Sequence, residues 1–519
     1  MLTYVDFFAG VGGSSWGASL VPGVRPVLAA NHWVRAIESH SANFPDTDHF
    51  RGDLHDVDVA GFPAADVFWA SPECPQWSNA RGRRRDFDKQ PDLFGETLPD
   101  PAADRSRALM WDVPRYLEAC QAKGRPVLAG VVENVIDVRA WDLWHTWRGT
   151  IRELGYDTRL IALNSMHARP VRTPYAPQSR DRLYLAYWHR SLGRNPDWDK
   201  WLRPTAWCPV CEQRVKTVQV FKNPRKDMGR YRQQYAYRCP RATCRNTVVE
   251  PTVLPAAVAI DWNRPGTRIG DRPEGLSPKT LARIRAGLDR YALPVTVPAG
   301  GTWRTEPSPV TAPLPTRTTR ENDALAVPPL LVPVEGRDGK QAAPVAEPLR
   351  TQTARNETGL AWLPFIAELR GGHSDARPIL EALATVTASG NHHGLVTPAQ
   401  PVRWDSLLVP YYGNGTARPV TTPVGTLPTH DRYGLATGAH VDLDQVLFRM
   451  LEPYEIGRGM AFTDTYRVLG TKRERVRQYG NAVTPPVAEI LVSALVETIT
   501  GTDLDRETDT PAPEVVMAA

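Results

Sequence analysis

One cysteine of this sequence has the placement expected of a nucleophile. Cys74 lies in SPECPQWS (71–78), which directly follows the apolar run DVFWA. A thiol on a loop at the carboxyl end of a strand is open to substrate, whereas most lone cysteines are buried and inert. The basic stretch RGRRR (81–85) comes next. It favours a loop that binds phosphates over an ordinary solvated surface.

An acidic residue and two arginines flank other apolar runs. Glu133 directly follows VLAGVV, while Arg180 and Arg182 stand in QSRDR, which leads into LYLAYW. An acidic side chain just after an apolar strand is not expected in the core, and in a parallel sheet the carboxyl ends of the strands meet at one edge. We therefore predict that Glu133 and both guanidinium groups lie in the same crevice as Cys74.

Glycines occupy the turn after the first apolar run. In DFFAGVGG (6–13), Gly10, Gly12 and Gly13 lack the Cβ atoms that would keep a ligand away from the backbone. Such turns bind dinucleotides or S-adenosylmethionine, and some bind nothing. Near the other end of the chain, GNAVTPP (480–486) opens a predicted helix with prolines in its first turn.

The order of apolar runs predicts the scaffold that positions these residues. Short apolar runs alternate with helical patterns over residues 1–195. This alternation is typical of an α/β fold with a Rossmann-like, doubly wound, mostly parallel sheet and helices on both faces. The predicted strands are residues 3–8, 26–30, 66–70, 127–132 and 183–187.

Four of the six cysteines form two close pairs between residues 200 and 255. They are Cys208, Cys211, Cys239 and Cys244. The spacing is that of a four-thiolate zinc ribbon with a structural zinc ion, although four incidental thiols are the alternative. The segment 222–238 between the pairs is basic and aromatic, which suits contacts with phosphates and base faces.

A repeated pattern fills residues 256–440. TRTTRENDALA, TQTARNETGLA, TVTASGNHHGLV and TLPTHDRYGLA place equivalent leucines at Leu325, Leu360, Leu395 and Leu435. Spacings of 35, 35 and 40 residues for one pattern imply one supersecondary unit used four times, and its Thr, Val and Gly content favours β-rich units. Residues 441–500 are predicted to be helical again, including 445–450. The acidic, Pro-rich tail 501–519 is predicted to be disordered.

Composition limits the classes of protein that remain. A chain of 519 residues with 42% hydrophobic residues can form two or three domains, and its net charge of +5 does not by itself indicate a nucleic-acid partner. Six cysteines are too few for a secreted disulfide scaffold. We found no signal-like N-terminus and no run of membrane-spanning length, so we expect a cytoplasmic protein.

Taken in order, these segments resemble the motifs of the DNA (cytosine-5) methyltransferase family. DFFAGVGG is similar to the family's cofactor motif, PECPQWS to its nucleophile motif, ENV to its carboxylate motif, QSRDR to its arginine motif and GNAVTPPV to its final motif. RMLEPYEIGRGMAF (449–462) is similar to the penultimate motif. The resemblance makes 1–195 and 441–500 two parts of one catalytic domain, with 256–440 as a target-recognition region.

The resemblance implies a role for each matched residue. Cys74 would add to carbon 6 of cytosine, Glu133 would bind the ring nitrogen and amine, and Arg182, with Arg180 nearby, would bind the carbonyl oxygen or a phosphate. S-adenosylmethionine would be bound by Phe8, Ala9, Gly10, Gly12, Gly13, His32, Asp53, Asn481 and Val483. Two positions depart from the family: Glu73 replaces a proline, and His32 replaces an acidic residue.

The implied partner is double-stranded DNA, from which the target base must be flipped to expose its carbon 5. The setting would be restriction-modification, with a cognate nuclease, or protection of phage DNA, and the protein would act as a monomer. The alternatives are a DNA-binding protein that has lost turnover through Glu73, and a transferase that acts on RNA or moves another group.

Overall fold

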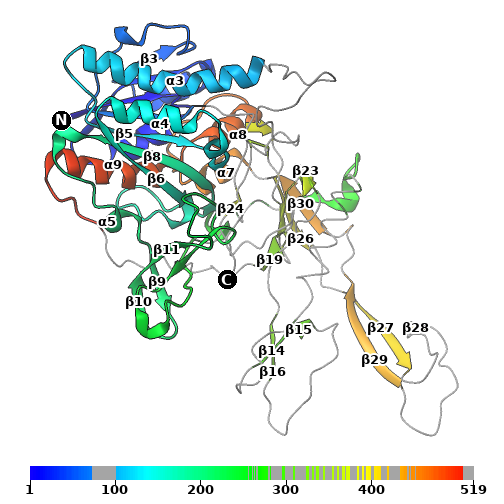
Figure 1. Ribbon diagram of the computed structural model, residues 1–519. Helices are drawn as coiled ribbons and strands as arrows, with labels where there is room; N and C mark the ends of the chain where they lie inside the picture. The colour runs from blue at the N-terminus through cyan, green and yellow to red at the C-terminus, as the bar shows by residue number, and fades with distance from the viewer. Residues whose placement is uncertain are drawn as a thin grey trace, which may run out of the picture.

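The computed structural model describes residues 1–72, 101–254 and 452–506, together with shorter segments between residues 256 and 450. A seven-stranded sheet forms its centre (Figure 1). In spatial order the strands are β3 (Asp48–Arg51), β2 (Val24–Asn31), β1 (Leu2–Phe7), β4 (Val67–Ala70), β5 (Ala129–Asn134), β8 (Asp181–His189) and β6 (Tyr156–Asn164).

The predicted doubly wound, mostly parallel sheet is confirmed. Neighbouring strands from β3 to β5 are parallel, whereas β8 runs antiparallel to both β5 and β6. Five of these strands match the apolar runs of the sequence, whereas β3 and β6 were not predicted. Because β8 runs backwards, its first residues lie at the same edge of the sheet as the last residues of β5.

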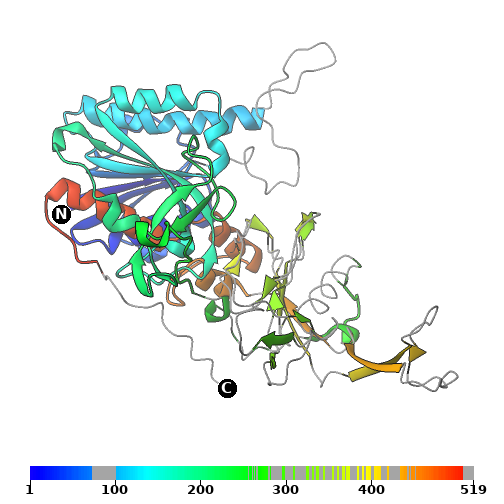
Figure 2. The same cartoon turned by 60° about the horizontal axis from the view of Figure 1, so that its bottom comes forward.

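Helices cover both faces of the sheet, as Figure 2 shows. The helices are α1 (Gly13–Ser19), α2 (Val34–Asn43), α3 (Pro101–Ala122), α4 (Trp144–Glu153), α5 (Trp198–Leu202), α7 (Pro453–Gly459), α8 (Lys472–Asn481) and α9 (Pro485–Thr500). Single 3₁₀ turns are η1 (Val59–Gly61), η3 (Ile136–Ala140), η4 (Ser165–His167), η5 (Arg190–Leu192), η6 (Ala242–Cys244), η7 (Ala256–Ala259) and η8 (Ile269–Asp271).

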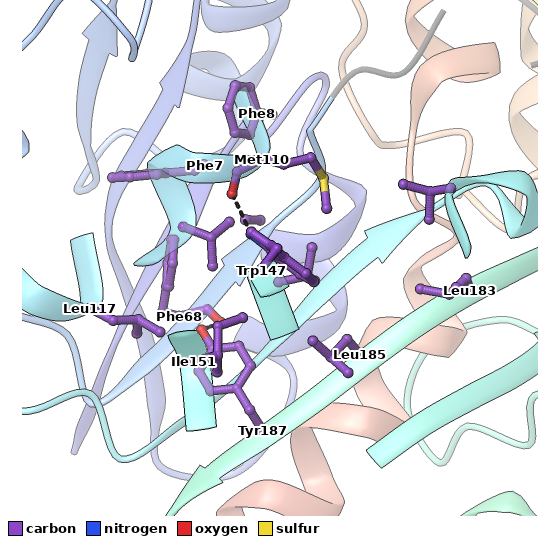
Figure 3. Close-up of a cluster of buried hydrophobic side chains, with 14 of the residues drawn as sticks. Phe7, Phe8, Phe68, Met110, Leu117, Trp147, Ile151, Leu183, Leu185 and Tyr187 are labelled. Carbon is purple, nitrogen blue, oxygen red and sulfur yellow. Dashed lines mark hydrogen bonds between the residues drawn. The ribbon is translucent and has the colours of Figure 1, made fainter. Parts of the chain in front are cut away.

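Each face has its own buried core. On one face, α3 and α4 pack Met110, Leu117, Trp147 and Ile151 against strand residues such as Phe68 (Figure 3). The Trp147 Nε1–H donates a hydrogen bond of 2.8 Å to the Met110 carbonyl, so burial leaves this polar group satisfied. On the other face, α1 and the nearly all-buried α9 pack against the sheet.

The apolar C-terminal helix belongs to this core. Its N-cap is Thr484, two prolines occupy its first turn, and Gly501 ends it with φ 71°. Contrary to the expectation that no run reaches membrane-spanning length, one window within Lys472–Thr500, which comprises α8 and α9, has the length and apolar composition of a membrane span. However, 89% of this window is buried inside the protein, as in a core helix.

Two antiparallel hairpins follow the sheet. Their strands are β9 (Thr205–Cys208) with β10 (Gln213–Lys216), and β11 (Val218–Phe221) with β12 (Tyr235–Arg238). The first hairpin has a small core of its own that includes the four paired cysteines. The second packs its aromatic side chains into the core beneath α3 and α4.

The described segments between residues 295 and 450 that have regular structure are mainly strands. They are β14 (Val295–Pro298), β15 (Ser308–Pro309), β16 (Asp323–Ala326), β17 (Leu330–Leu331), β18 (Glu335–Arg337), β19 (Ala343–Pro344), β20 (Ala354–Arg355), β21 (Gly359–Ala361), β22 (Phe365–Glu368), β23 (Arg370–His373), β24 (Leu383–Ala384), β25 (Ala388–Gly390), β26 (His393–Pro398), β27 (Arg403–Pro410), β28 (Arg418–Pro419), β29 (Tyr433–His440) and β30 (Val446–Met450). The short β7 (Gln178–Ser179) and β13 (Thr267–Arg268) precede them and pair with β24 and β30.

The strands follow the sequence repeat. Leu325, Leu360, Leu395 and Leu435 fall in β16, β21, β26 and β29. Three repeats place their strands in the same spatial order, β15-β14-β16, β19-β17-β21 and β28-β27-β29. In the parallel pair β21–β26, Leu360 and Leu395 are direct partners.

One secondary-structure prediction in this part of the chain is wrong. Residues 445–450 were expected to be helical, but β30 pairs along its length with β26. Val446, Leu447 and Phe448 suit a strand, and pairing with β26 outweighs the weak helical periodicity of so short a run. The tail predicted for residues 501–519 lies outside the described residues beyond Arg506.

Candidate active site

The strand order reverses between β1 and β4, so ligands of such a sheet are expected where these two strands end. The glycine turn follows β1 at this point. Phe8, Gly10 and Gly12 all have positive φ, at 60°, 55° and 94°. A non-glycine residue in this conformation stores strain and is typical of functional turns.

The surroundings of the glycines show which of them face a ligand. A Cβ added to Gly13 would lie 2.0 Å from the Val483 carbonyl oxygen, so Gly13 allows the C-terminal motif to approach. A Cβ added to Gly10 would meet nothing within 4 Å. The Gly10 N–H also donates no hydrogen bond within the described part of the chain. This side of the turn therefore fits a bound ligand.

The other predicted cofactor residues surround the same edge of the sheet. His32 comes just after β2, the neighbour of β1, and Asp53 comes just after β3, the next strand outward. The Asp53 Oδ1 accepts a hydrogen bond from the His55 N–H, and His32 is exposed. Ala9 and Val483 are buried, while Asn481 is exposed at the end of α8.

A buried polar network that the sequence analysis missed supports the turn from below. The Asp6 Oδ2 accepts hydrogen bonds of 2.6 Å from the hydroxyls of Ser14 and Ser15. Ser15 is hydrogen bonded to His40 (3.0 Å), which is hydrogen bonded to His49 (2.8 Å). Burial raises the pKa of Asp6 to about 7 and lowers the pKa of His40 to about 3.

Cys74, Glu73 and the basic stretch 81–85 lie outside the described residues, but Ser71 and Pro72, which directly precede them, are described. The Ser71 N–H donates to the Phe7 carbonyl (3.1 Å) at the end of β1. The Asn134 Nδ2 donates to the Pro72 carbonyl (3.3 Å) at the end of β5. Residues 71–72, which precede Cys74 in the sequence, therefore lie between the end of β1 and Asn134, the neighbour of Glu133.

Glu133 and Arg182 form an ion pair at this edge. The Arg182 Nε lies 3.1 Å from the Glu133 Oε1, and both side chains are largely buried. The contact is possible because β8 is antiparallel to β5 and starts where β5 ends. The structure thus brings together a carboxylate and a guanidinium that are 49 residues apart in sequence, as the sequence analysis predicted.

Arg180 has a different environment from Arg182. It is buried, and its Nη1 donates to the Gly480 carbonyl (3.2 Å) of the C-terminal motif. Its backbone N–H donates to the Oδ1 of Asn164 (3.0 Å), a residue that the sequence analysis missed. Burial lowers the pKa of Arg180 to about 9. These contacts favour a positioning role for Arg180, and its contact with the base or a phosphate stays a prediction.

The four paired cysteines converge on one point. Their sulfur atoms all lie within 4.8 Å of one another, and none forms a disulfide. Each pair is followed by a residue with left-handed backbone, Glu212 after Cys211 and Arg245 after Cys244. Sulfur atoms around a tetrahedral zinc ion lie about 3.8 Å apart, so the cluster fits such an ion.

The aromatic residues between the cysteine pairs are not available to stack on bases. Tyr231, Tyr235 and Tyr237 are buried, and the rings of Tyr231 and Tyr237 pack edge-on against His167. The prediction that this segment presents base-stacking aromatics is therefore wrong for these three. Their role is to attach the hairpin β11–β12 to the catalytic core.

Comparisons with known proteins agree with this site. Residues 2–228 match the family model for C-5 cytosine-specific DNA methylase. Over 189 residues the chain is 25% identical to the type II methyltransferase M1.ScrFI of Lactococcus lactis subsp. cremoris, covering 36% of this chain and 41% of that protein. Over 198 residues it is 29% identical to the type II methyltransferase M.HgiBI of Herpetosiphon aurantiacus, covering 37% of this chain and 38% of that protein.

The chain thus spans less than half the length of the curated relatives that it matches. Among solved structures it is similar to the S. pombe Dnmt2 methyltransferase, with a TM-score of 0.46 and 12% identity, covering 96% of this chain and 100% of that one. Residues 2–228 thus match the C-5 cytosine-specific DNA methylase family, and this match supports the family predicted from the order of the motifs.

Proposed function

We propose that this protein is a DNA cytosine-5 methyltransferase, which transfers a methyl group from S-adenosylmethionine to carbon 5 of a flipped-out cytosine. The observation that carries the proposal is the Glu133–Arg182 ion pair at the sheet edge, beside the start of the loop that contains Cys74. The family match of residues 2–228 supports it.

The chemistry assigns a task to each residue at this edge. Carbon 5 of cytosine is too weak a nucleophile to take a sulfonium methyl group unaided. Addition of the Cys74 thiolate to carbon 6 makes carbon 5 nucleophilic. Once carbon 5 is methylated, loss of its proton to a base expels the thiolate and restores the aromatic ring.

Glu133 and Arg182 would bind the base during this reaction. The Glu133 carboxylate accepts a hydrogen bond from the exocyclic amine and stabilises the protonated ring nitrogen, where electron density collects. The Arg182 guanidinium binds the carbonyl oxygen. Because each holds the other in place before substrate arrives, little reorganisation is needed when the base enters.

The residues around the glycine turn fit S-adenosylmethionine, which supplies an electrophilic methyl group when bound. The Gly10 side of the turn is open, and its N–H is available to a ligand. Phe8 and Val483 would enclose the cofactor, and Asp53 would bind the adenine amine. His32, at the position where the family has an acidic residue, would approach the ribose.

Two other parts of the chain would serve DNA recognition. The repeats in 256–440 would form the target-recognition region, since one β unit used several times can present several equivalent loops to a groove. A structural zinc ion held by the four cysteines would stabilise the hairpin β9–β10, whose core is too small to be stable alone. We propose a setting of restriction-modification or protection of phage DNA.

Methyl transfer from labelled S-adenosylmethionine to mixed-sequence duplex DNA tests the proposal. Glu133→Gln should lower the rate by about 100-fold or more, the usual effect of losing a group that stabilises the transition state. Glu118→Gln, which changes the exposed carboxylate Glu118 on α3, should leave the rate unchanged.

Other outcomes would select a different function. DNA binding by the wild type without transfer would indicate a DNA-binding protein that has lost turnover through Glu73. Transfer to matched RNA but not to DNA would indicate an RNA enzyme. Equal activity of Glu133→Gln and the wild type would refute the role assigned to the ion pair.

A further inference from the structure

The segment that contains the cysteine pairs has a larger net positive charge than the whole chain. Residues 203–250 include eleven Lys and Arg but three Asp and Glu, a formal charge of +8, whereas the whole chain carries +5. We call these residues the ribbon. A strong concentration of one sign on one small unit indicates a partner of opposite charge.

Many of these cations are available to a partner. Arg203, Arg230 and Arg232 form ion pairs with carboxylates. Seven others are exposed and lie in no ion pair within the described part of the chain: Arg214, Lys216, Lys222, Arg225, Lys226, Arg241 and Arg245. Because no carboxylate pairs with these seven side chains in the described part of the chain, their positive charges face the solvent.

The hairpin β9–β10 combines this charge with an exposed aromatic ring. Arg214 is the direct cross-strand partner of Trp207, and Lys216 is the partner of Thr205, so all four side chains lie on one face. Trp207 is 55% exposed. The opposite face carries the buried Ala206, Cys208 and Val215. The hairpin therefore presents a tryptophan flanked by two cations to the solvent.

The ribbon is fixed beside the proposed active site. The Tyr231 N–H donates to the Asp181 Oδ1 (3.1 Å), and Asp181 precedes Arg182. The Arg230 Nη2 lies 2.8 Å from the Asp137 Oδ2, just beyond the end of β5. The buried tyrosines attach the hairpin β11–β12 to the main core. Figure 1 shows β9 and β10 extending away from the sheet beyond β11.

From these observations we infer that the ribbon is a sequence-independent clamp on duplex DNA. Arg214 and Lys216 bind phosphates of the duplex that flanks the target base, and Trp207 contacts a sugar or base edge between them. The unpaired Lys and Arg side chains of this face favour a polyanion, and the phosphates of DNA provide that charge. The inference rests on the proposed function, because it takes the DNA bound at the active site as the ligand of the ribbon.

The salt dependence of binding to mixed-sequence duplex DNA tests this clamp. Each phosphate contact contributes about 0.9 to the slope of log affinity against log salt. Arg214→Gln combined with Lys216→Gln should reduce the slope by about 1.8. Between about 50 and 200 mM salt, the affinity of the wild type should then fall about 12-fold more than that of the variant. Trp207→Ala should weaken binding at every salt concentration without changing the slope.

A matched pair of substitutions serves as the control. Arg25→Gln combined with Arg125→Gln removes the same charge at the opposite edge of the sheet, where β2 and β5 begin, and should leave the slope unchanged. Zinc content equal to the wild type shows that a variant ribbon is folded. If the Arg214→Gln/Lys216→Gln variant loses zinc, Lys222→Gln with Arg225→Gln and Lys226→Gln gives an independent test. It removes three cations, so the slope should fall by up to about 2.7.

Failure of the clamp and failure of the proposed function have different signatures. The slope is measured without catalysis, so it tests the clamp even if no methyl group is transferred. With an active enzyme, the hairpin variant should have a higher KM for DNA and an unchanged kcat. Slopes equal to the wild type in both ribbon variants would overturn the clamp. Ribbon variants that bind duplex DNA like the wild type, but have lost affinity for a protein or for RNA, would also overturn it.

Discussion

Replacing Asp6 by Asn should remove a pH dependence of stability that this buried carboxyl imposes on the fold. Asp6 lies beneath the glycine turn and is fully buried. Tyr4, Ser14 and Ser15 are its closest polar neighbours, and no cation is among the groups that shift its pKa. Burial therefore raises its pKa from 3.8 to about 7.

Because the pKa of Asp6 is raised in the folded state, its contribution to stability falls as the pH rises. Between pH 4 and 7, roughly, the folded state keeps a proton that the unfolded state has released. The resulting stabilisation is fully present below the unfolded pKa of 3.8 and is lost as the pH rises through about 7. A shift of about three pKa units corresponds to about 4 kcal/mol at most, of which roughly 2.5 kcal/mol is lost between about pH 5 and 8.

Urea unfolding at several pH values measures this loss. The wild type should lose roughly 2.5 kcal/mol more than Asp6→Asn as the pH rises from about 5 to 8. His40 acts in the opposite direction, because its pKa is lowered to about 3 and its contribution is lost as the pH falls. That contribution is common to both proteins and cancels in the comparison. Parallel profiles for the two proteins would refute the raised pKa of Asp6.

Three further substitutions test other parts of the account. Gly13→Ala should lower stability by about 1–3 kcal/mol in thermal unfolding, because its Cβ would lie 2.0 Å from the Val483 carbonyl oxygen; an unchanged Tm would contradict this contact. Glu489→Gln should speed amide exchange at residues 171–173, because the Glu489 carboxylate accepts hydrogen bonds from all three backbone N–H groups; unaltered exchange would argue against that role. Cys239→Ser should abolish zinc binding measured by elemental analysis, and a variant that retains zinc would exclude the four-thiolate site.

The sheet was predictable because its central strands are short apolar runs, buried on both faces. The edge strand β3 lacks such a run. The other edge strand, β6, has one only in its second half, after the polar and partly exposed residues 157–159, so neither strand was predicted. The antiparallel direction of β8 was also hidden, since direction depends on the connections between strands and not on residue type.

The candidate site was predictable where its residues directly flank apolar strands, as Glu133 and Arg182 do. Arg180 stands between β7 and β8, outside both strands, so its burial against Gly480 could not be inferred from strand alternation. The network from Asp6 to His49 was also beyond prediction, because it joins side chains from two strands and two helices. The sequence around each of these residues carries no pattern that would indicate such a contact.

Methylation of DNA by the wild type and by Cys74→Ser tests the central claim most directly. After incubation with S-adenosylmethionine and duplex DNA, bisulfite sequencing reports which cytosines carry a carbon 5 methyl group. We expect protected cytosines in a short sequence context with the wild type and none with Cys74→Ser. Cys120→Ala, which changes the buried thiol of α3, should act like the wild type. Normal methylation by Cys74→Ser would contradict the account.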